Sequence, residues 1–187
     1  EITCLTRKPP SELYMENFST CNAEVNTIVG SYDDEELWKK SLDGVDIVFH
    51  LAAQTSLYKA EADLLEDFKS NVYPMQLLLQ AASQSATKPF VAFAGSATQC
   101  GLTKILPVGE SVNDKPSTVY DFHKLLAENY LKFYINKNVI NGVCLRLSNV
   151  FGPGPQSSND DRGILNLMVK KALQKEKLTI YGSGDFT

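Results

Sequence analysis

Residues 90–101 read FVAFAGSATQCG, and this stretch has the two features that decide the fold, an apolar strand and a polar turn after it. It opens with an apolar run of strand length, and the small polar residues after that run end the strand. Further runs that we expect to be strands occupy residues 1–7, 25–29, 45–51 and 139–147. Helix-length segments alternate with such runs, which is typical of βαβ units feeding a parallel sheet. The sequence therefore predicts an α/β fold built on a Rossmann-like, doubly wound parallel sheet.

Helices are expected where apolar residues recur at helical spacing or where acidic residues open a first turn. The expected helices cover residues 33–42, 64–83, 117–134 and 161–174. Pro74 lies inside the second of these and predicts a kink or a restart. The largely apolar strand at 45–51 is expected to be buried on both faces, with His50 packed at its end. Residues 178–181 are expected to form a short final strand.

Composition bounds the class of protein. The chain has 187 residues, a net charge of -4 and 43% hydrophobic residues, which suits one globular core and argues against a nucleic-acid or membrane-surface partner. No apolar run approaches the roughly 20 residues needed to span a bilayer, and the first residues show no signal-peptide organisation, so a cytoplasmic location is predicted. Four cysteines without C-x-x-C spacing and two histidines predict no metal site.

Tyr120 and Lys124 lie one helical turn apart at the start of the predicted helix 117–134, and Ser96 precedes the tyrosine by 24 residues. On one helix face, an ammonium beside a phenol favours the ionised form of that phenol. A phenol tuned in this way can take or give a proton near neutral pH. The arrangement predicts redox chemistry at a sugar-like hydroxyl. The competing interpretation is an exposed aromatic residue next to a solvated charge.

Four stretches resemble one family. They are HLAAQTS (50–56), GSATQCG (95–101), YDFHK (120–124) and LRLSNVFGPG (145–154), and they resemble the extended short-chain dehydrogenases/reductases, most closely the nucleotide-sugar epimerase/dehydratase branch. The resemblance implies NAD or NADP as cofactor, a nucleotide-sugar or another small hydroxyl or carbonyl substrate, and a homodimer formed through the helices expected at 64–83 and 117–134.

The resemblance also implies a domain organisation. No G-x-x-G-x-x-G or G-x-G-x-x-G motif occurs, so the first strand and the glycine turn of such a sheet are expected upstream of residue 1. Residues 1–151 are then expected to form the NAD(P)-binding Rossmann-like domain without its N-terminal part. Residues 152–187 are expected to begin a small C-terminal substrate-binding region.

Site residues follow from the resemblance position by position. Tyr120 is implied as the acid/base, Lys124 as the hydrogen-bond donor to the nicotinamide ribose, and Ser96 as the group that holds the reacting oxygen. Cofactor contacts are implied, or in one case suggested by charge, for Arg7, Leu51, Ala52, Ala53, Asn71, Ala94, Gly95, Tyr120, Lys124, Asn149 and Val150. Substrate contacts are implied for Gln54, Ser96, Thr98 and Asn149.

Two departures from the family pattern bear on the reaction and on the cofactor. Where dehydratases of this family have an Asp-Glu pair after the catalytic hydroxyl, this chain has Ala97 and Thr98, so water elimination lacks its acid and base. Epimerisation and simple carbonyl reduction remain open, as does a non-catalytic role as a cofactor sensor or scaffold. Arg7 and Lys8 would suit a 2′-phosphate and favour NADP. His123 is expected on the surface.

Overall fold

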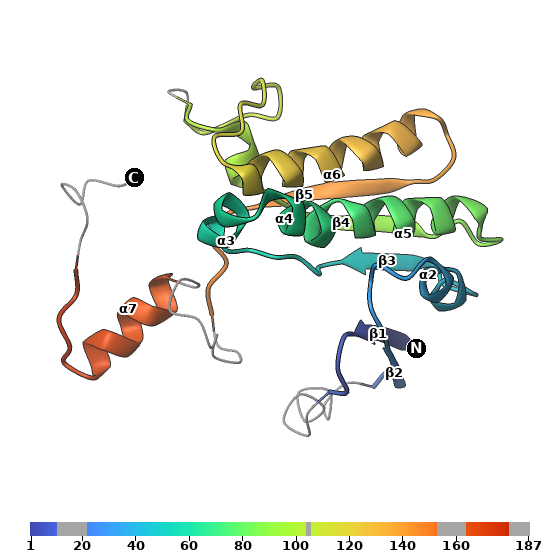
Figure 1. Cartoon of the computed structure of the whole chain (residues 1–187), viewed down its shortest axis with the longest axis horizontal. Coiled ribbons are helices and arrows are strands. Elements are labelled where there is room, and N and C mark those ends of the chain that lie inside the picture. Colours follow the sequence, from blue (N-terminus) through green and yellow to red (C-terminus); the bar gives the residue numbers. More distant parts are fainter. Residues whose placement is uncertain (11–21, 104–105, 153–163, 180–187) are drawn as a thin grey trace. The chain divides into compact units, whose positions relative to one another are not determined.

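The computed structural model describes residues 1–10, 22–103, 106–152 and 164–179 (Figure 1). The chain divides into two compact units, Glu1–Arg146 and Leu147–Thr187. The first unit carries all elements up to β5, and the second carries α7 (Ile164–Leu173). The boundary at residues 151 and 152 stays a prediction. Cys21, residues 161–163 of the last expected helix and residues 180–181 of the last expected strand lie outside the described ranges.

The strands of the first unit form two parallel pairings. β1 pairs with β2 so that Ile2 lies opposite Val25, and β3 pairs with β4 so that Ile47 lies opposite Phe90. β5 is the other neighbour of β4. Parallel strands connected through helices confirm the predicted α/β class. The bounds are β1 Ile2–Thr6, β2 Val25–Val29, β3 Ile47–His50, β4 Phe90–Ser96 and β5 Gly142–Leu147.

The described helices of the first unit lie in the expected segments, except for a helix at Leu57–Ala62 that the sequence did not predict. The expected break near Pro74 is confirmed, because one helix ends at Asn71 and the next begins at Tyr73 with the proline in its first turn. No helix in the described ranges is long and apolar enough to cross a membrane. The helices of the first unit are α2 Glu35–Ser41, α3 Leu57–Ala62, α4 Leu64–Asn71, α5 Tyr73–Gln84 and α6 Val119–Asn136, and the 3-10 turn η1 covers Ala97–Cys100.

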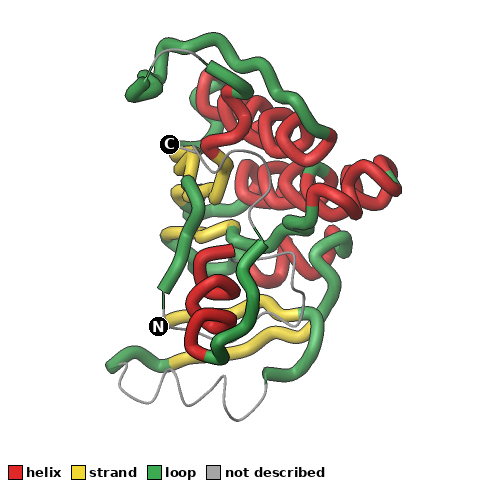
Figure 2. Tube along the Cα trace, turned by 90° about the vertical axis from the view of Figure 1, so that its left-hand side faces the viewer, coloured by secondary structure: helices red, strands yellow, loops and turns green. Residues whose placement is uncertain are grey.

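The core of the first unit lies between the helices and one face of the sheet formed by β3, β4 and β5. α4 and α5 pack against α6, and α6 packs against β4. Figure 2 shows helices gathered on one side of these strands. Fully buried side chains fill the contact, among them Met75, Leu78, Phe93 and Leu131. This packing fixes α6 over the strand that ends at Ser96.

The prediction that residues 45–51 are buried on both faces is wrong. Val48 packs against the core and His50 is buried, but Ile47 is 53% and Phe49 66% exposed. Successive side chains of a strand point to opposite faces. Within the first unit, the described helices pack against the face toward which Val48 and His50 point. The apolar run correctly indicated a strand, but it carried no information on which layers cover that strand.

Candidate active site

Ser96 stands where β4 ends and η1 begins, and two reciprocal hydrogen bonds fix it there. The Gln99 side chain accepts a hydrogen bond from the Ser96 backbone N–H at 2.6 Å, and the backbone N–H of Thr98 donates to Ser96 Oγ at 3.4 Å. This capping box satisfies backbone donors at the start of the turn. Gly95 permits the close packing behind it, because a Cβ there would lie 2.5 Å from the Cys144 sulfur.

A partly buried network of charged side chains binds Gln99. The fully buried Gln99 donates to Glu128 Oε2 at 2.6 Å, and Arg146 binds the same carboxylate from β5 at 2.8 and 2.9 Å. Arg146 also forms a bidentate pair with Asp114, at 2.6 and 2.8 Å. Burial alone would raise the pKa of the Glu128 carboxyl, but hydrogen bonds from four side chains outweigh burial and lower it to about 2. The support of Ser96 is therefore a charged, fully hydrogen-bonded cluster.

Tyr120 and Lys124 occupy the first turns of α6, one turn apart as predicted. Tyr120 is half-buried, whereas Lys124 is only 3% exposed. The Lys124 ammonium lies 4.3 Å from the centroid of the Phe93 ring of β4. Burial lowers the pKa of Lys124 to about 8, against a smaller opposing effect of Cys144 and Asp67. Because Phe93 belongs to β4, this contact places the ammonium against the sheet; Figure 1 shows α6 running along β5.

Thr98 connects the turn after β4 to the first turn of α6. Its hydroxyl lies 2.7 Å from Ser96 Oγ and donates a short hydrogen bond to Oδ1 of Asp121. Asp121 is 4% exposed and directly follows Tyr120. Its backbone N–H donates to the capping hydroxyl of Thr118 at 3.1 Å. The structure therefore brings the predicted substrate residues Ser96 and Thr98 to the turn of helix that carries Tyr120.

A second buried network holds the loop after β3. The amide group of Asn71 exchanges two hydrogen bonds of 3.0 Å with the backbone of Gln54. Asp67 accepts from the side chains of both residues at 2.9 Å, and its other oxygen lies 2.7 Å from Nδ1 of His123. The expectation that His123 lies on the surface is wrong, since it is 7% exposed. Its partner Asp67 comes from α4, 56 positions earlier in the sequence.

The remaining predicted site residues follow strands β1 and β3, lie within β4 or belong to the second unit. Leu51, at 69% exposure, and Ala52 are open to solvent after β3, and Ala53 is half-buried. Ala94 and Gly95 belong to β4. Arg7 is exposed after β1, with its guanidinium 5.6 Å from the centroid of the Tyr32 ring. Asn149 and Val150 are exposed residues of the second unit.

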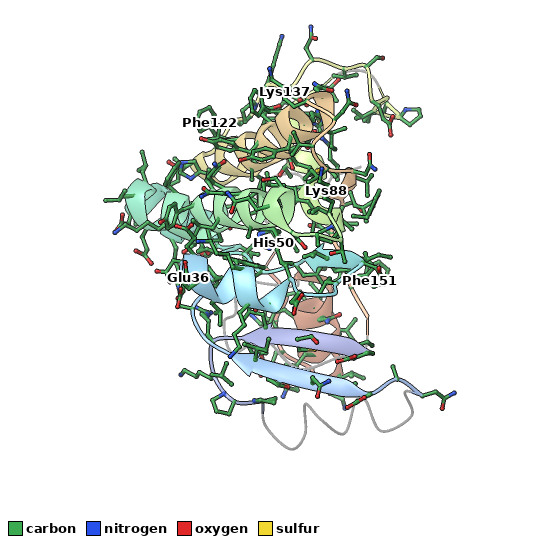
Figure 3. The ribbon with its side chains drawn as sticks, turned by 90° about the vertical axis from the view of Figure 1, so that its right-hand side faces the viewer. Glu36, His50, Lys88, Phe122, Lys137 and Phe151 are labelled. Carbon is green, nitrogen blue, oxygen red and sulfur yellow. The ribbon has the colours of Figure 1, made fainter. Side chains whose placement is uncertain are left out.

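His50 follows the sequence-based expectation of a packed histidine. Its ring stacks on Phe93 with the centroids 5.8 Å apart, and Trp38 approaches its edge at 6.1 Å. Burial, aided by the charge of Lys124, lowers the pKa of His50 to about 4, so the ring is neutral at physiological pH. Figure 3 labels His50 on its strand. Within the described ranges, no group of three or more His, Cys, Asp or Glu side chains could hold a metal ion.

Comparison with known proteins then assigns the chain to a family. The family model of NAD-dependent epimerases and dehydratases matches residues 1–187, which is the whole chain. The chain belongs to this epimerase/dehydratase family. The predicted resemblance is thereby confirmed, and the Rossmann-like α/β fold is confirmed by solved structures of similar proteins.

Relatives within the epimerase/dehydratase family extend well beyond the chain. A putative UDP-glucose 4-epimerase of Methanocaldococcus jannaschii is 25% identical over 172 residues, which are 91% of this chain and 56% of that protein. The UDP-N-acetylglucosamine 4-epimerase of Methanobrevibacter ruminantium, solved with UDP-N-acetylmuramic acid, is 28% identical with a TM-score of 0.86, over 98% of this chain and 58% of that one. The UDP-glucose 4-epimerase of Thermotoga maritima, solved with UDP-glucose, is 25% identical with a TM-score of 0.84, over 98% and 59%. The chain thus spans little more than half the length of these proteins.

Three polar residues of this site were not predicted from the sequence. They are Asp67, Asp121 and Glu128, and each is buried and contacts a residue that the sequence did single out or that neighbours one. The helical spacing of Asp67 and Asn71 was a usable signal, because residues four apart share a helix face. Asp121 and Glu128 share the helix of Lys124 but bind partners on η1, and nothing local in the sequence reveals such pairings.

Proposed function

We propose that the protein of which this chain is a part is an NAD-dependent nucleotide-sugar epimerase. The observation that supports this best is the polar chain from Ser96 through Thr98 to Asp121, which ties the serine to the turn of α6 that carries Tyr120 and lies one turn before Lys124. Similarity to UDP-sugar 4-epimerases supports the substrate class. NAD is the proposed cofactor because the family is NAD-dependent.

The donor set suits a dinucleotide and a sugar hydroxyl. The ammonium of Lys124, whose pKa burial lowers to about 8, is the proposed hydrogen-bond donor to the ribose hydroxyls of the cofactor. The small, exposed Ala52 after β3 permits close approach of a ligand to the backbone. When bound, NAD supplies the hydride acceptor and donor. Tyr120 takes the proton of the reacting sugar hydroxyl and returns it, Ser96 hydrogen-bonds the reacting oxygen, and Lys124 favours the ionised phenol.

Elimination of water is disfavoured by the residues after Ser96. Ala97 has no acid or base, and the Thr98 hydroxyl is engaged with Asp121. Asp121 itself is 4% exposed and bonded to Thr98, so it is placed as a support and not as a free acid for dehydration. We therefore propose epimerisation over dehydration. Carbonyl reduction is the alternative that uses the same side chains.

The test uses the full-length protein with NAD or NADP and a panel of UDP-, dTDP-, GDP- and CDP-sugars. Interconversion of two epimers without net accumulation of reduced cofactor supports the proposal, whereas stoichiometric formation of reduced cofactor together with an oxidised sugar supports the dehydrogenase/reductase alternative. Tyr120→Phe should abolish turnover and leave the dissociation constant of NAD unchanged. Tight NAD binding without any product would instead support the non-catalytic sensor.

We further propose that the protein is a homodimer built through α4, α5 and α6. Large apolar side chains on these helices are exposed, including Leu65 at 62%, Phe122 at 54% and Phe133 at 57%. Phe122 is labelled on α6 in Figure 3. Contiguous exposed apolar surface marks interaction sites. Sedimentation equilibrium should show a dimer for the full-length protein and a monomer for the Phe122→Glu, Phe133→Glu double variant, while a monomeric wild type would contradict the assembly.

A further inference from the structure

Asp67 lies at the centre of the buried network that holds the loop after β3. It is 1% exposed, and Oδ1 of its carboxylate accepts from the side-chain amides of Gln54 and Asn71 at 2.9 Å each. Its Oδ2 lies 2.7 Å from Nδ1 of His123 in α6. An ionised carboxylate only accepts, so Nδ1 of His123 carries the proton of this contact. One buried carboxylate therefore joins the loop after β3 to α4 and to α6.

The Gln54 side chain transmits this anchoring to the loop itself. Its Nε2 donates to the backbone oxygen of Ser56 at 2.8 Å as well as to Asp67, and its Oε1 accepts from the backbone N–H of Ser56 at 2.5 Å. Both amide hydrogens of Gln54 are therefore used within the loop and its anchor. The backbone of Gln54 is held too, by the two hydrogen bonds that it exchanges with Asn71. The shape of the loop thus depends on groups that Asp67 fixes.

We infer that Asp67, through its hydrogen bond to His123, is a positioning residue that holds the two proposed sides of the NAD site in register. One side is the loop at residues 51–53, and the other is Lys124, which directly follows His123 in α6. The charge of Asp67 also acts on Lys124, because it opposes the lowering of the lysine pKa by burial. The inference rests on the proposed function, since that function assigns NAD contacts to both sides.

The surroundings of the Asp67–His123 pair favour a single arrangement. The His123 ring is 7% exposed and lies between two aromatic rings, with centroids 5.8 Å from that of Phe68 and 5.9 Å from that of Phe122. A carboxylate or an imidazole left unpaired in such a place is unfavourable, so the two groups stay bonded. Their helices, α4 and α6, also pack against each other. Both partners therefore sit on elements that other contacts immobilise, as a positioning role requires.

The binding test uses the full-length protein with NAD alone, well below the melting temperature of each variant. Asp67→Asn and His123→Leu should each raise the dissociation constant of NAD by roughly fivefold to thirtyfold, the range for residues that act through their neighbours. His123→Asn, whose amide can donate in place of Nδ1, should restore the affinity to within about twofold. Asp63→Asn is the matched control, since Asp63 caps the same helix and asparagine caps equally well. Wild-type affinity in both Asp67→Asn and His123→Leu would overturn the inference, and so would a failure of His123→Asn to restore it.

Two measurements on the wild type keep the inference falsifiable if a variant fails to fold. Nitrogen NMR of full-length protein should find a proton on Nδ1 of His123, and an unprotonated Nδ1 would overturn the pairing. Because coupling is reciprocal, NAD should slow hydrogen exchange of the backbone N–H of Gln54, and an unchanged rate would contradict the positioning role. Neither measurement uses a sugar. If no sugar nucleotide is turned over but NAD binding and exchange behave as described, the proposed reaction fails and the positioning role of Asp67 stands.

Discussion

Replacing Lys124 by methionine should make the protein more stable while it disables the site. Burial lowers the pKa of this lysine from 10.5 to about 8. A pKa difference of one corresponds to about 1.4 kcal/mol, so the buried ammonium destabilises the folded state by up to about 3 kcal/mol at pH 7. Methionine has a similar length, no charge and a sulfur that packs well against the ring of Phe93. Lys124→Met should therefore raise the free energy of unfolding by about 1–3 kcal/mol at pH 7.

The lowered pKa of Lys124 also makes the free energy of unfolding depend on pH. Because the folded-state pKa is lower than the unfolded one, the unfolded state binds more protons between pH 8 and 10.5, and the stability of the wild type rises across that window. The advantage of Lys124→Met should be largest below pH 8 and vanish near pH 10.5. Denaturant unfolding at a series of pH values measures it, with Lys69→Met on the exposed surface of α4 as control. A variant that is less stable at pH 7, or a difference that does not change with pH, would refute the reasoning.

Three further outcomes follow from the network around Ser96. The pKa of Glu128 is about 2 instead of 4.5, so its ionised carboxylate contributes up to about 3 kcal/mol to the free energy of unfolding above pH 4.5, and this contribution is lost as the pH falls toward 2. In Glu128→Gln, the free energy of unfolding should therefore depend less on pH between 4.5 and 2, and an unchanged dependence would contradict this. Gly95→Ala should destabilise by about 1–3 kcal/mol in thermal melts, because its Cβ would lie 2.5 Å from the Cys144 sulfur and 2.8 Å from Gln99 Oε1; a wild-type melting temperature would mean that both side chains shift freely. Burial and the neighbouring Glu128 raise the pKa of the Cys144 thiol to about 12, so peptide mapping after alkylation at pH 8 should find Cys144 unmodified in native protein, and rapid labelling would contradict this.

The fold was accessible from sequence where local pattern decides it. Apolar runs of strand length located β1 to β5 because a parallel sheet with helical connections needs such runs. Pro74 marked the restart between α4 and α5, since proline lacks the N–H that a helix interior needs. The six residues of α3, Leu57–Ala62, were missed because they are too few to show a helical period and depend on the Ser56 cap and on packing against α6.

The sequence allowed the main site residues to be predicted, but not the contacts between them. The chain order of Ser96, Tyr120 and Lys124 led to the helix and strand end that the structure links through Thr98. The burial of His123 was missed because it depends on Asp67, which approaches from another helix. Helix-surface position can be estimated from neighbouring residues, but the partner that neutralises a buried polar group is a property of tertiary packing.

The distribution of buried polar groups in the first unit is itself an argument for function. The buried residues of α5 are all apolar or proline, whereas α4, η1 and α6 bury seven ionisable or amide side chains, namely Asp67, Asn71, Gln99, Asp121, His123, Lys124 and Glu128. Burying such groups is unfavourable unless each is paired, and apolar residues of similar volume are often at least as stable. Stability alone gives no reason to place these groups around the ends of β3 and β4. Their concentration near the predicted site residues Gln54, Ser96 and Thr98 supports a functional role for this region. It follows that stabilising substitutions should be easiest to find here and should carry the largest loss of activity, as Lys124→Met illustrates.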